Sequence, residues 1–226
     1  MLPDGTVSTL TGLPTQVPST VDGPLPAARF IKPARLKADA QGNLYVVEGA
    51  AVRKIGTNGL VSTLLGRYSV TQRSFGDGNE AGFYTVISVA VGAAGQLYVT
   101  EADAAGRTWI RKFDAAGRWQ RLPNTADGTL SAPFAGDLTV DDNGNLYVLS
   151  AGLASNSILS FEGVYKITPS GAMTLYGGAV TPTYPVPAVL ARRLGTPVGI
   201  ALAPGSAGSR PAVVADRTGR VLQLTP

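Results

Sequence analysis

Apolar residues occur along this chain in short runs separated by polar, glycine-rich turns, and one of these runs is repeated. The copies read GNLYVVE at residues 42–48, GQLYVTE at 95–101, GNLYVLS at 144–150 and, in a divergent form, RPAVVAD at 210–216. A strand with one exposed face alternates apolar and polar residues, whereas these runs are apolar at consecutive positions. The pattern therefore predicts strands buried on both faces, as in a sheet that lies between two neighbouring sheets.

Each copy has the same place in a longer pattern of four predicted strands. An apolar strand precedes it, at 34–39, 87–91, 137–140 and 198–202, and a tight turn such as Asp142-Asn143-Gly144-Asn145 joins the two. A third strand follows at 52–55, 109–113, 164–167 and 221–224, and a fourth at 60–65, 118–122 and 172–176. Repeats of this kind predict an all-β fold, a β-propeller with four blades of four antiparallel strands.

The last copy stops after its third strand, and a matching fourth strand is found at the other end of the chain. Residues 3–12, PDGTVSTLTG, resemble residues 57–66, TNGLVSTLLG, of the first copy. We therefore expect residues 6–10 to pair beside residues 221–224 and close the ring, which removes exposed sheet edges. The alternative is a larger ring completed by another copy. Closure predicts one domain over residues 1–226, with blades at about 32–66, 85–123, 135–177 and 196–226 plus 3–12, and a monomer rather than a homodimer.

Composition limits the chemistry of the chain. Hydrophobic residues make up 44% of the 226 residues and charged residues 15%, so we expect a packed core. There is no Cys and no His, which excludes thiol catalysis and a Ser-His-Asp triad. The formal net charge of +4 is scattered, so nucleic-acid binding is not indicated, and no apolar run is long enough for membrane insertion. We expect no cofactor and no metal.

Further repeated pieces surround the strands. Asp22-Gly23 is followed by Ala28-Arg29-Phe30 and Pro33, Asp77-Gly78 by Phe83, and Asp127-Gly128 by Pro133-Phe134. Together with the strands, this pattern resembles the NHL-repeat family of β-propellers, especially its bacterial members, over nearly the whole chain. It departs from that family in blade number, since NHL propellers usually have six blades. It also departs at Ser150, where the acidic residue that usually ends the second strand is replaced.

The resemblance implies a non-catalytic binding or scaffold module that presents a loop face to a protein, peptide or glycan ligand. One alternative is a hydrolase or lyase with a metal-dependent site in the central channel, because some related six-bladed propellers are lactonases or lyases. Another is a purely structural repeat domain of a larger protein. We expect a protein that is not an enzyme, and the resemblance to bacterial NHL proteins outside the cytoplasm predicts a periplasmic or secreted location.

Glu48, Glu101 and Asp216 end equivalent strands, so propeller symmetry places them on one face near the ring axis. As a functional group they would form a ring of carboxylates for a cation or a basic ligand, and with Asp137 they would have to supply any channel metal site. The structural interpretation, which we favour, is that each accepts hydrogen bonds from its own blade's loop or from a neighbouring Arg.

Long insertions between repeats are the places where a rigid scaffold usually carries function. Residues 67–84 contain Tyr68, Arg73 and Phe75, and the Pro-rich residues 177–193 contain Tyr184 and Arg192. Aromatic and Arg side chains are enriched in binding hot spots. The candidate ligand-binding residues are therefore Glu48, Glu101, Asp216, Tyr68, Tyr184 and Arg192.

Three other patterns have structural interpretations. Basic residues recur on the third strands, and we interpret them as solvated outer positions that guard against mispairing: Arg53, Lys54, Arg111, Lys112 and Lys166. Phe30, Phe83 and Phe134 are expected to fill gaps between blades. Asp141, Asn143 and Asn145 have the spacing of the first ligands of a calcium loop, but the Gly is misplaced and residue 152 is Gly, so a hairpin turn is predicted.

Overall fold

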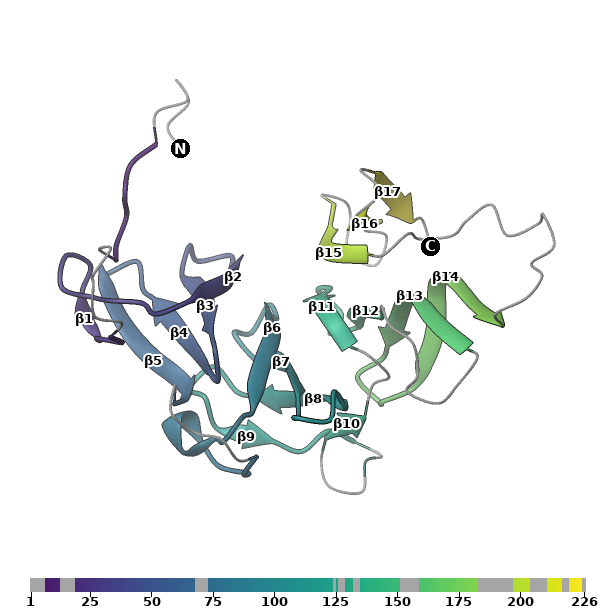
Figure 1. Ribbon diagram of the computed structural model, residues 1–226, viewed down its shortest axis with the longest axis horizontal. Helices are drawn as coiled ribbons and strands as arrows, with labels where there is room; N and C mark the ends of the chain where they lie inside the picture. The colour runs from purple at the N-terminus through teal and green to yellow at the C-terminus, as the bar shows by residue number, and fades with distance from the viewer. Residues whose placement is uncertain are drawn as a thin grey trace.

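The described part of the protein, seen in a computed structural model, consists almost entirely of β-structure. It comprises residues 7–12, 19–67, 73–123, 125, 129–131, 135–150, 159–182, 197–203, 211–216 and 220–224. Its strands form four small antiparallel sheets, and the helix found among these residues is the short 3-10 turn η1 (Gly78–Glu80). Figure 1 shows the sheets arranged in sequence order around a common centre, which confirms the predicted four-bladed β-propeller.

The strands follow the repeats closely. The first sheet has the order β1-β5-β4-β3-β2, with β1 (Gly23–Pro24), β2 (Pro33–Ala38), β3 (Leu44–Glu48), β4 (Ala51–Ile55) and β5 (Leu60–Gly66). In the second, β6 (Thr85–Val91), β7 (Leu97–Ala102) and β8 (Thr108–Phe113) are followed by β9 (Trp119–Gln120) and β10 (Leu130–Ser131), which both pair with β8. The third contains β11 (Ala135–Val140), β12 (Leu146–Ser150), β13 (Leu159–Ile167) and β14 (Met173–Pro182), and the fourth contains β15 (Pro197–Leu202), β16 (Ala212–Asp216) and β17 (Val221–Leu224).

The first strands of the repeats, β2, β6, β11 and β15, lie nearest the centre (Figure 1). Each has a register irregularity near its start, between Pro33 and Arg35, Val86 and Ser88, Ala135 and Leu138, and Pro197 and Gly199. An irregularity of this kind increases the local twist of a strand. Its repetition shows that the repeats share backbone geometry as well as sequence.

The second strands are buried on both faces, as the apolar runs predict. In β7, Leu97 and Val99 belong to the cluster shared with the first sheet, whereas Tyr98 belongs to the cluster shared with the third. In β12, Tyr147 packs toward the fourth sheet and Val148 toward the second. Successive side chains of a strand point to opposite faces, so a sheet between two others needs apolar residues at consecutive positions.

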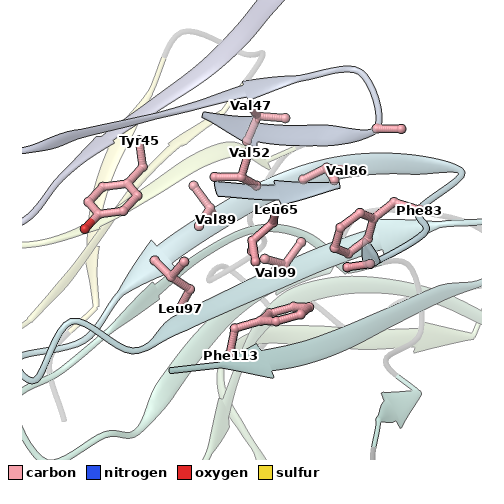
Figure 2. Packing of buried hydrophobic residues seen from close by; sticks show 12 residues of the cluster. Tyr45, Val47, Val52, Leu65, Phe83, Val86, Val89, Leu97, Val99 and Phe113 are labelled. Carbon is pink, nitrogen blue, oxygen red and sulfur yellow. The ribbon is translucent and has the colours of Figure 1, made fainter. Parts of the chain in front are cut away.

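Figure 2 shows the hydrophobic cluster between the first and second sheets. Phe83 is fully buried there, with its ring centre 6.1 Å from that of Phe113, which confirms that it fills the gap between two blades. Phe30 is partly buried on the other side of the first sheet, against the cluster that contains Val46 and Ile55. Phe134 lies outside the described residues.

The fourth sheet differs from the prediction. Among the described strands, β17 pairs with β16 and with no other. Residues 7–12 form no strand, and Val7 and Leu10 are 75% and 57% exposed. The Thr11 hydroxyl donates to the Leu25 carbonyl at 2.6 Å, which holds this segment beside the first sheet, across the opening from β17 (Figure 1). The closing pair expected for residues 6–10 is therefore not formed by residues 7–10, and residue 6 lies outside the described part.

The fourth and first sheets approach each other mainly through long polar side chains. The Arg35 guanidinium donates to the Val198 carbonyl at 3.2 Å, and the Lys37 ammonium donates to the Ile200 carbonyl at 3.4 Å. Buried hydrophobic clusters join the other three pairs of neighbouring sheets, but none of the clusters formed by the described residues joins these two. The described chain also contains no helix with the length and apolar character needed to cross a bilayer.

Candidate functional site

Glu48, at the end of β3, forms a buried ion pair with Arg53 of β4. Its Oε2 lies 3.2 Å from Nη1 of Arg53, and both residues have no exposed surface. Glu48 Oε1 accepts a hydrogen bond from the Ile31 N–H at 2.5 Å, and Arg53 donates to the carbonyls of Val21 and Arg29. The pair therefore ties the segment ahead of β2 to β3 and β4.

The second sheet repeats this arrangement. Arg111 lies 3.6 Å from Glu101 and donates to the carbonyls of Gly82 and Ser74 at 2.9 and 3.0 Å. Glu101 also accepts a hydrogen bond from Nε of Arg73 at 2.9 Å. Burial raises the pKa of Glu101 although both guanidinium groups oppose the shift, and burial lowers the pKa of Arg111 to about 10. Both charges are thus removed from water, and each depends on the other for compensation.

The third sheet lacks both members of the pair. Tyr165 lies opposite Val148 as Arg111 lies opposite Val99, so Tyr165 takes the position of Arg111. Ser150, the last residue of β12, takes the position that Glu101 has in β7. The departure at Ser150 is thereby explained, because the Arg that would need a carboxylate is absent as well. Asp216 ends β16, and its side chain lies outside the described part.

These contacts correct the interpretation of two third-strand arginines as solvated residues. Arg53 and Arg111 are fully buried rather than solvated, and carboxylate and carbonyl oxygens accept hydrogen bonds from, or pair with, their Nη groups. Glu48 and Glu101 are 0% and 1% exposed, and both accept hydrogen bonds from neighbouring groups, in agreement with the structural interpretation favoured from the sequence.

The lysines of the third strands have a repeated partner. Lys54, Lys112 and Lys166 place their ammonium groups 5.7, 5.7 and 5.8 Å from the ring centres of Tyr45, Tyr98 and Tyr147, which lie opposite them in register. A cation–π contact of this kind contributes about 0.5–1 kcal/mol at a partly exposed site.

Residues 141–145 form a hairpin turn between β11 and β12, as predicted. The Asp141 carboxylate accepts hydrogen bonds from the backbone N–H groups of Asn143 and Asn145 at 3.0 and 2.8 Å, and from the Tyr147 hydroxyl at 3.2 Å. Gly144 has a φ of 78°, a left-handed conformation that favours glycine. The oxygens of Asp141 are thus used within the turn.

The first sheet has an equivalent turn. There the Asp39 carboxylate accepts hydrogen bonds from Asn43 and from the Tyr45 hydroxyl. Burial acts to raise the pKa of Asp39, but the hydrogen bonds from Asn43, Tyr45 and Gln41 outweigh it and lower the pKa below its ordinary value. This carboxylate is therefore stabilised as an anion by its own turn.

Asp137 connects the four inner strands at the centre of the propeller. Its carboxylate lies 3.0 Å from the Lys37 ammonium and accepts hydrogen bonds from the Ser88 hydroxyl at 2.5 Å and the Ile200 N–H at 3.0 Å. These residues come from β11, β2, β6 and β15 respectively. Asp137 is 5% exposed, so its buried charge is compensated by groups from the three other blades.

A cavity of about 460 Å³ opens beside this centre and is lined by Lys37, by Asp39, Asp141 and Asp142 of the turns, and by Thr139 and Ile200. The carboxylates of Asp39 and Asp141 accept hydrogen bonds within their turns, and Asp137 is engaged with Lys37. Within the described ranges, no group of three or more Asp, Glu, His or Cys side chains is placed to hold a metal ion.

A partly exposed group of aromatic and arginine side chains lies at the outer side of the second sheet. We call Arg73, Phe75, Arg107, Trp109 and Trp119 the aromatic–arginine surface. The Arg73 guanidinium lies 4.5 Å from the Trp109 ring centre and 5.2 Å from that of Phe75, and Arg107 lies 5.5 Å from Trp109. The Phe75 ring is 5.3 Å from Trp119, which packs on the core cluster beneath it. Phe75 is 48% exposed.

This surface was only partly foreseen. The insertion at 67–84 points to Arg73 and Phe75, but Trp109 and Trp119 lie on strands and give no signal in the sequence apart from their type. Pairing of β8 with β9 and folding of the insertion over that edge bring the four together. Tyr68, Tyr184 and Arg192 lie outside the described residues, so they stay predictions.

Comparison with known proteins supports the fold and leaves the family open. No protein-family model and no curated protein matches the chain. A solved gluconolactonase from Xanthomonas campestris matches with a TM-score of 0.54 and 12% identity, over 89% of this chain and 59% of the other. An auxiliary nutrient binding protein from Bacteroides thetaiotaomicron matches with a TM-score of 0.57 and 14% identity, over 96% of this chain and 48% of the other. The chain thus has the fold of propeller-type proteins and spans about half to three fifths of their length.

Proposed function

We propose that this propeller is a non-catalytic binding module and that a protein or peptide segment docks on the aromatic–arginine surface. The observation that carries the proposal is the placement of Arg73 between Trp109 and Phe75, with Phe75 48% exposed. Trp and Arg side chains dominate the energetics of protein interfaces, whereas most exposed side chains contribute little. A cluster of both kinds on one edge of a rigid sheet fits this role.

The surface is held in place before any partner arrives. Nε of Arg73 donates to Glu101 at 2.9 Å, and Nη2 donates to the Thr129 hydroxyl at 3.0 Å. The backbone N–H of Trp119 donates to Asp77 at 2.7 Å, which fixes the insertion against β9. Side chains that are already ordered lose little conformational entropy on binding. The aromatic rings supply the apolar area of the surface. Both guanidinium groups are already paired with carboxylates, Arg73 with Glu101 and Arg107 with Asp103, which fixes their positions.

The alternative function is a metal-dependent hydrolase or lyase. The similarity to a gluconolactonase does not support it, because that similarity concerns the fold alone. Such a site would need Asp137 at the centre, whose oxygens contact Lys37, Ser88 and Ile200. A binding role agrees with the name of the Bacteroides protein, which has the same fold. A periplasmic or secreted location stays a prediction from the sequence.

The test is a screen of the purified chain against a peptide array and a glycan array, repeated with variants. We expect peptide ligands whose affinity falls by roughly 30-fold in Phe75→Ser and in Trp109→Ser, as for interface hot spots. Tyr84→Ser is the matched control, since Tyr84 is an exposed aromatic residue outside this surface. Ligands that bind both surface variants as well as the wild type, or glycan ligands alone, would contradict the proposal.

A further inference from the structure

The outer edge of β17 has no pairing strand among the described residues. In the other three sheets a further strand pairs with the third strand: β5 with β4, β9 and β10 with β8, and β14 with β13. No strand of the described chain does so for β17, where Val221 is 73% exposed. Such an edge presents unpaired N–H and C=O groups and favours pairing with another strand.

The segment at residues 7–12 has the sequence of the missing strand. Val-Ser-Thr-Leu occurs at 7–10 and again at 61–64 within β5. Val61 of β5 is 2% exposed, whereas its counterpart Val7 is 75% exposed. Thr11 holds the segment to Leu25 at the first sheet, and Figure 1 shows it on the other side of the opening from β17. An exposed strand sequence and the edge that it matches are thus present in one molecule without contacting each other.

We propose that residues 7–11 of one molecule pair with β17 of a second copy, and that two molecules exchange these segments reciprocally. The contact is a β-strand addition, in which main-chain hydrogen bonds supply the affinity. Reciprocal exchange of an identical element is a low-cost route to a closed dimer. The monomer predicted from the sequence depended on closure within one chain, which the described residues do not form.

The first sheet supplies the expected register. There Val61 lies opposite Ile55, Ser62 opposite Lys54 and Thr63 opposite Arg53. The repeat alignment converts these pairs into Val7 opposite Leu224, Ser8 opposite Gln223 and Thr9 opposite Leu222. Ser8 and Gln223 are both exposed in the structure, so cysteine at either position leaves the core unchanged.

The chain contains no Cys, which makes cross-linking specific. We would mix Ser8→Cys with Gln223→Cys under mild oxidation. Opposed Cα atoms of an antiparallel pair lie about 4.5–5.5 Å apart, within reach of a disulfide. We expect a heterodimer of twice 23.2 kDa. It should form roughly tenfold faster than between Ser8→Cys and the exposed-turn control Ala116→Cys, because pairing raises the local thiol concentration.

Sedimentation equilibrium of the unmodified chain gives a second readout. The wild type should sediment as a dimer, and so should Ser8→Ala/Thr9→Ala. Ser8→Pro/Thr9→Pro removes backbone donors from the segment and should sediment as a monomer. Two results would overturn the proposal. One is a wild type of single-chain mass at every concentration. The other is a double variant, Ser8→Cys/Gln223→Cys, that cross-links within one chain while the mixed single variants do not cross-link.

Discussion

The Glu48 carboxylate and the Arg53 guanidinium are 3.2 Å apart in a site that no water-accessible surface reaches, and Glu101 and Arg111 repeat the relationship one blade later. In both blades the Arg also holds two carbonyls of the segment that leads into the sheet. A buried pair of this kind is costly to break from one side only. It fixes the path of the chain between blades, and in the second blade that path carries Arg73 and Phe75.

Removing one member of the Glu101–Arg111 pair should therefore lower the free energy of unfolding more than replacing both members. We expect Arg111→Met to lower the free energy of unfolding by about 3–5 kcal/mol, because Glu101 keeps a buried charge with less compensation. The double variant Glu101→Ser/Arg111→Tyr copies the residues of the third sheet and should lose less than the sum of its two single variants. Urea unfolding of the wild type, Glu101→Ser, Arg111→Tyr and the double variant measures this coupling. Strictly additive losses in the free energy of unfolding would contradict it.

Substitutions of Phe83 and of Phe75 should differ in their effect on stability. Phe83 is fully buried between two blades, so Phe83→Ala should lower the free energy of unfolding by about 3–5 kcal/mol. Phe75→Ala removes a ring that is 48% exposed and should cost less than about 1 kcal/mol. Thermal unfolding of both variants checks the difference, and a large loss for Phe75→Ala would mean that the aromatic–arginine surface is part of the core.

Stability should fall in alkali through the buried tyrosines. Burial, together with Asp39 or Asp141 nearby, raises the pKa of Tyr45 and of Tyr147 from 10.0 to about 12. The folded chain keeps a proton that the unfolded chain releases, so this contribution is complete below pH 10 and is lost as the pH rises toward 12. The contribution to the free energy of unfolding is roughly 1–2 kcal/mol for each tyrosine. Urea unfolding at several pH values should show a flatter decline for Tyr45→Phe/Tyr147→Phe, and an unchanged slope would refute this assignment.

Asp137 should hold the fourth blade to the others. Asp137→Ala removes the acceptor shared by Lys37, Ser88 and Ile200, and we expect a loss of about 2–4 kcal/mol. The Ile200 amide should then exchange its hydrogen faster. Asp142→Ala, in the exposed turn beside it, is the control and should change stability by less than about 0.5 kcal/mol. Unchanged exchange at Ile200 in Asp137→Ala would show that Asp137 does not connect the blades.

Local periodicity was sufficient to predict the sheets, because apolar runs such as 44–47 and 97–99 report burial on both faces directly. The turn at Asp141 was predictable too, since Asn-Gly favours a tight turn. The burial of Arg53 and Arg111 was not, because a strand pattern does not show which loop carbonyls will fold over a basic residue. Nor was the contact of Trp109 with Arg73, which depends on how an insertion crosses a sheet edge. Closure of the ring was predicted from matching ends, and a match of sequences does not fix whether they pair within one molecule.

The most direct test of the binding account is a tryptophan fluorescence titration with a peptide recovered from the array. Both tryptophans of the chain, Trp109 and Trp119, lie in the aromatic–arginine surface, so any partner that docks there changes their environment. We predict a saturable change in emission whose midpoint equals the dissociation constant measured by calorimetry, and its loss in Phe75→Ser. A peptide that binds in the calorimeter while the emission of both tryptophans stays unchanged would place the binding site elsewhere and contradict the account.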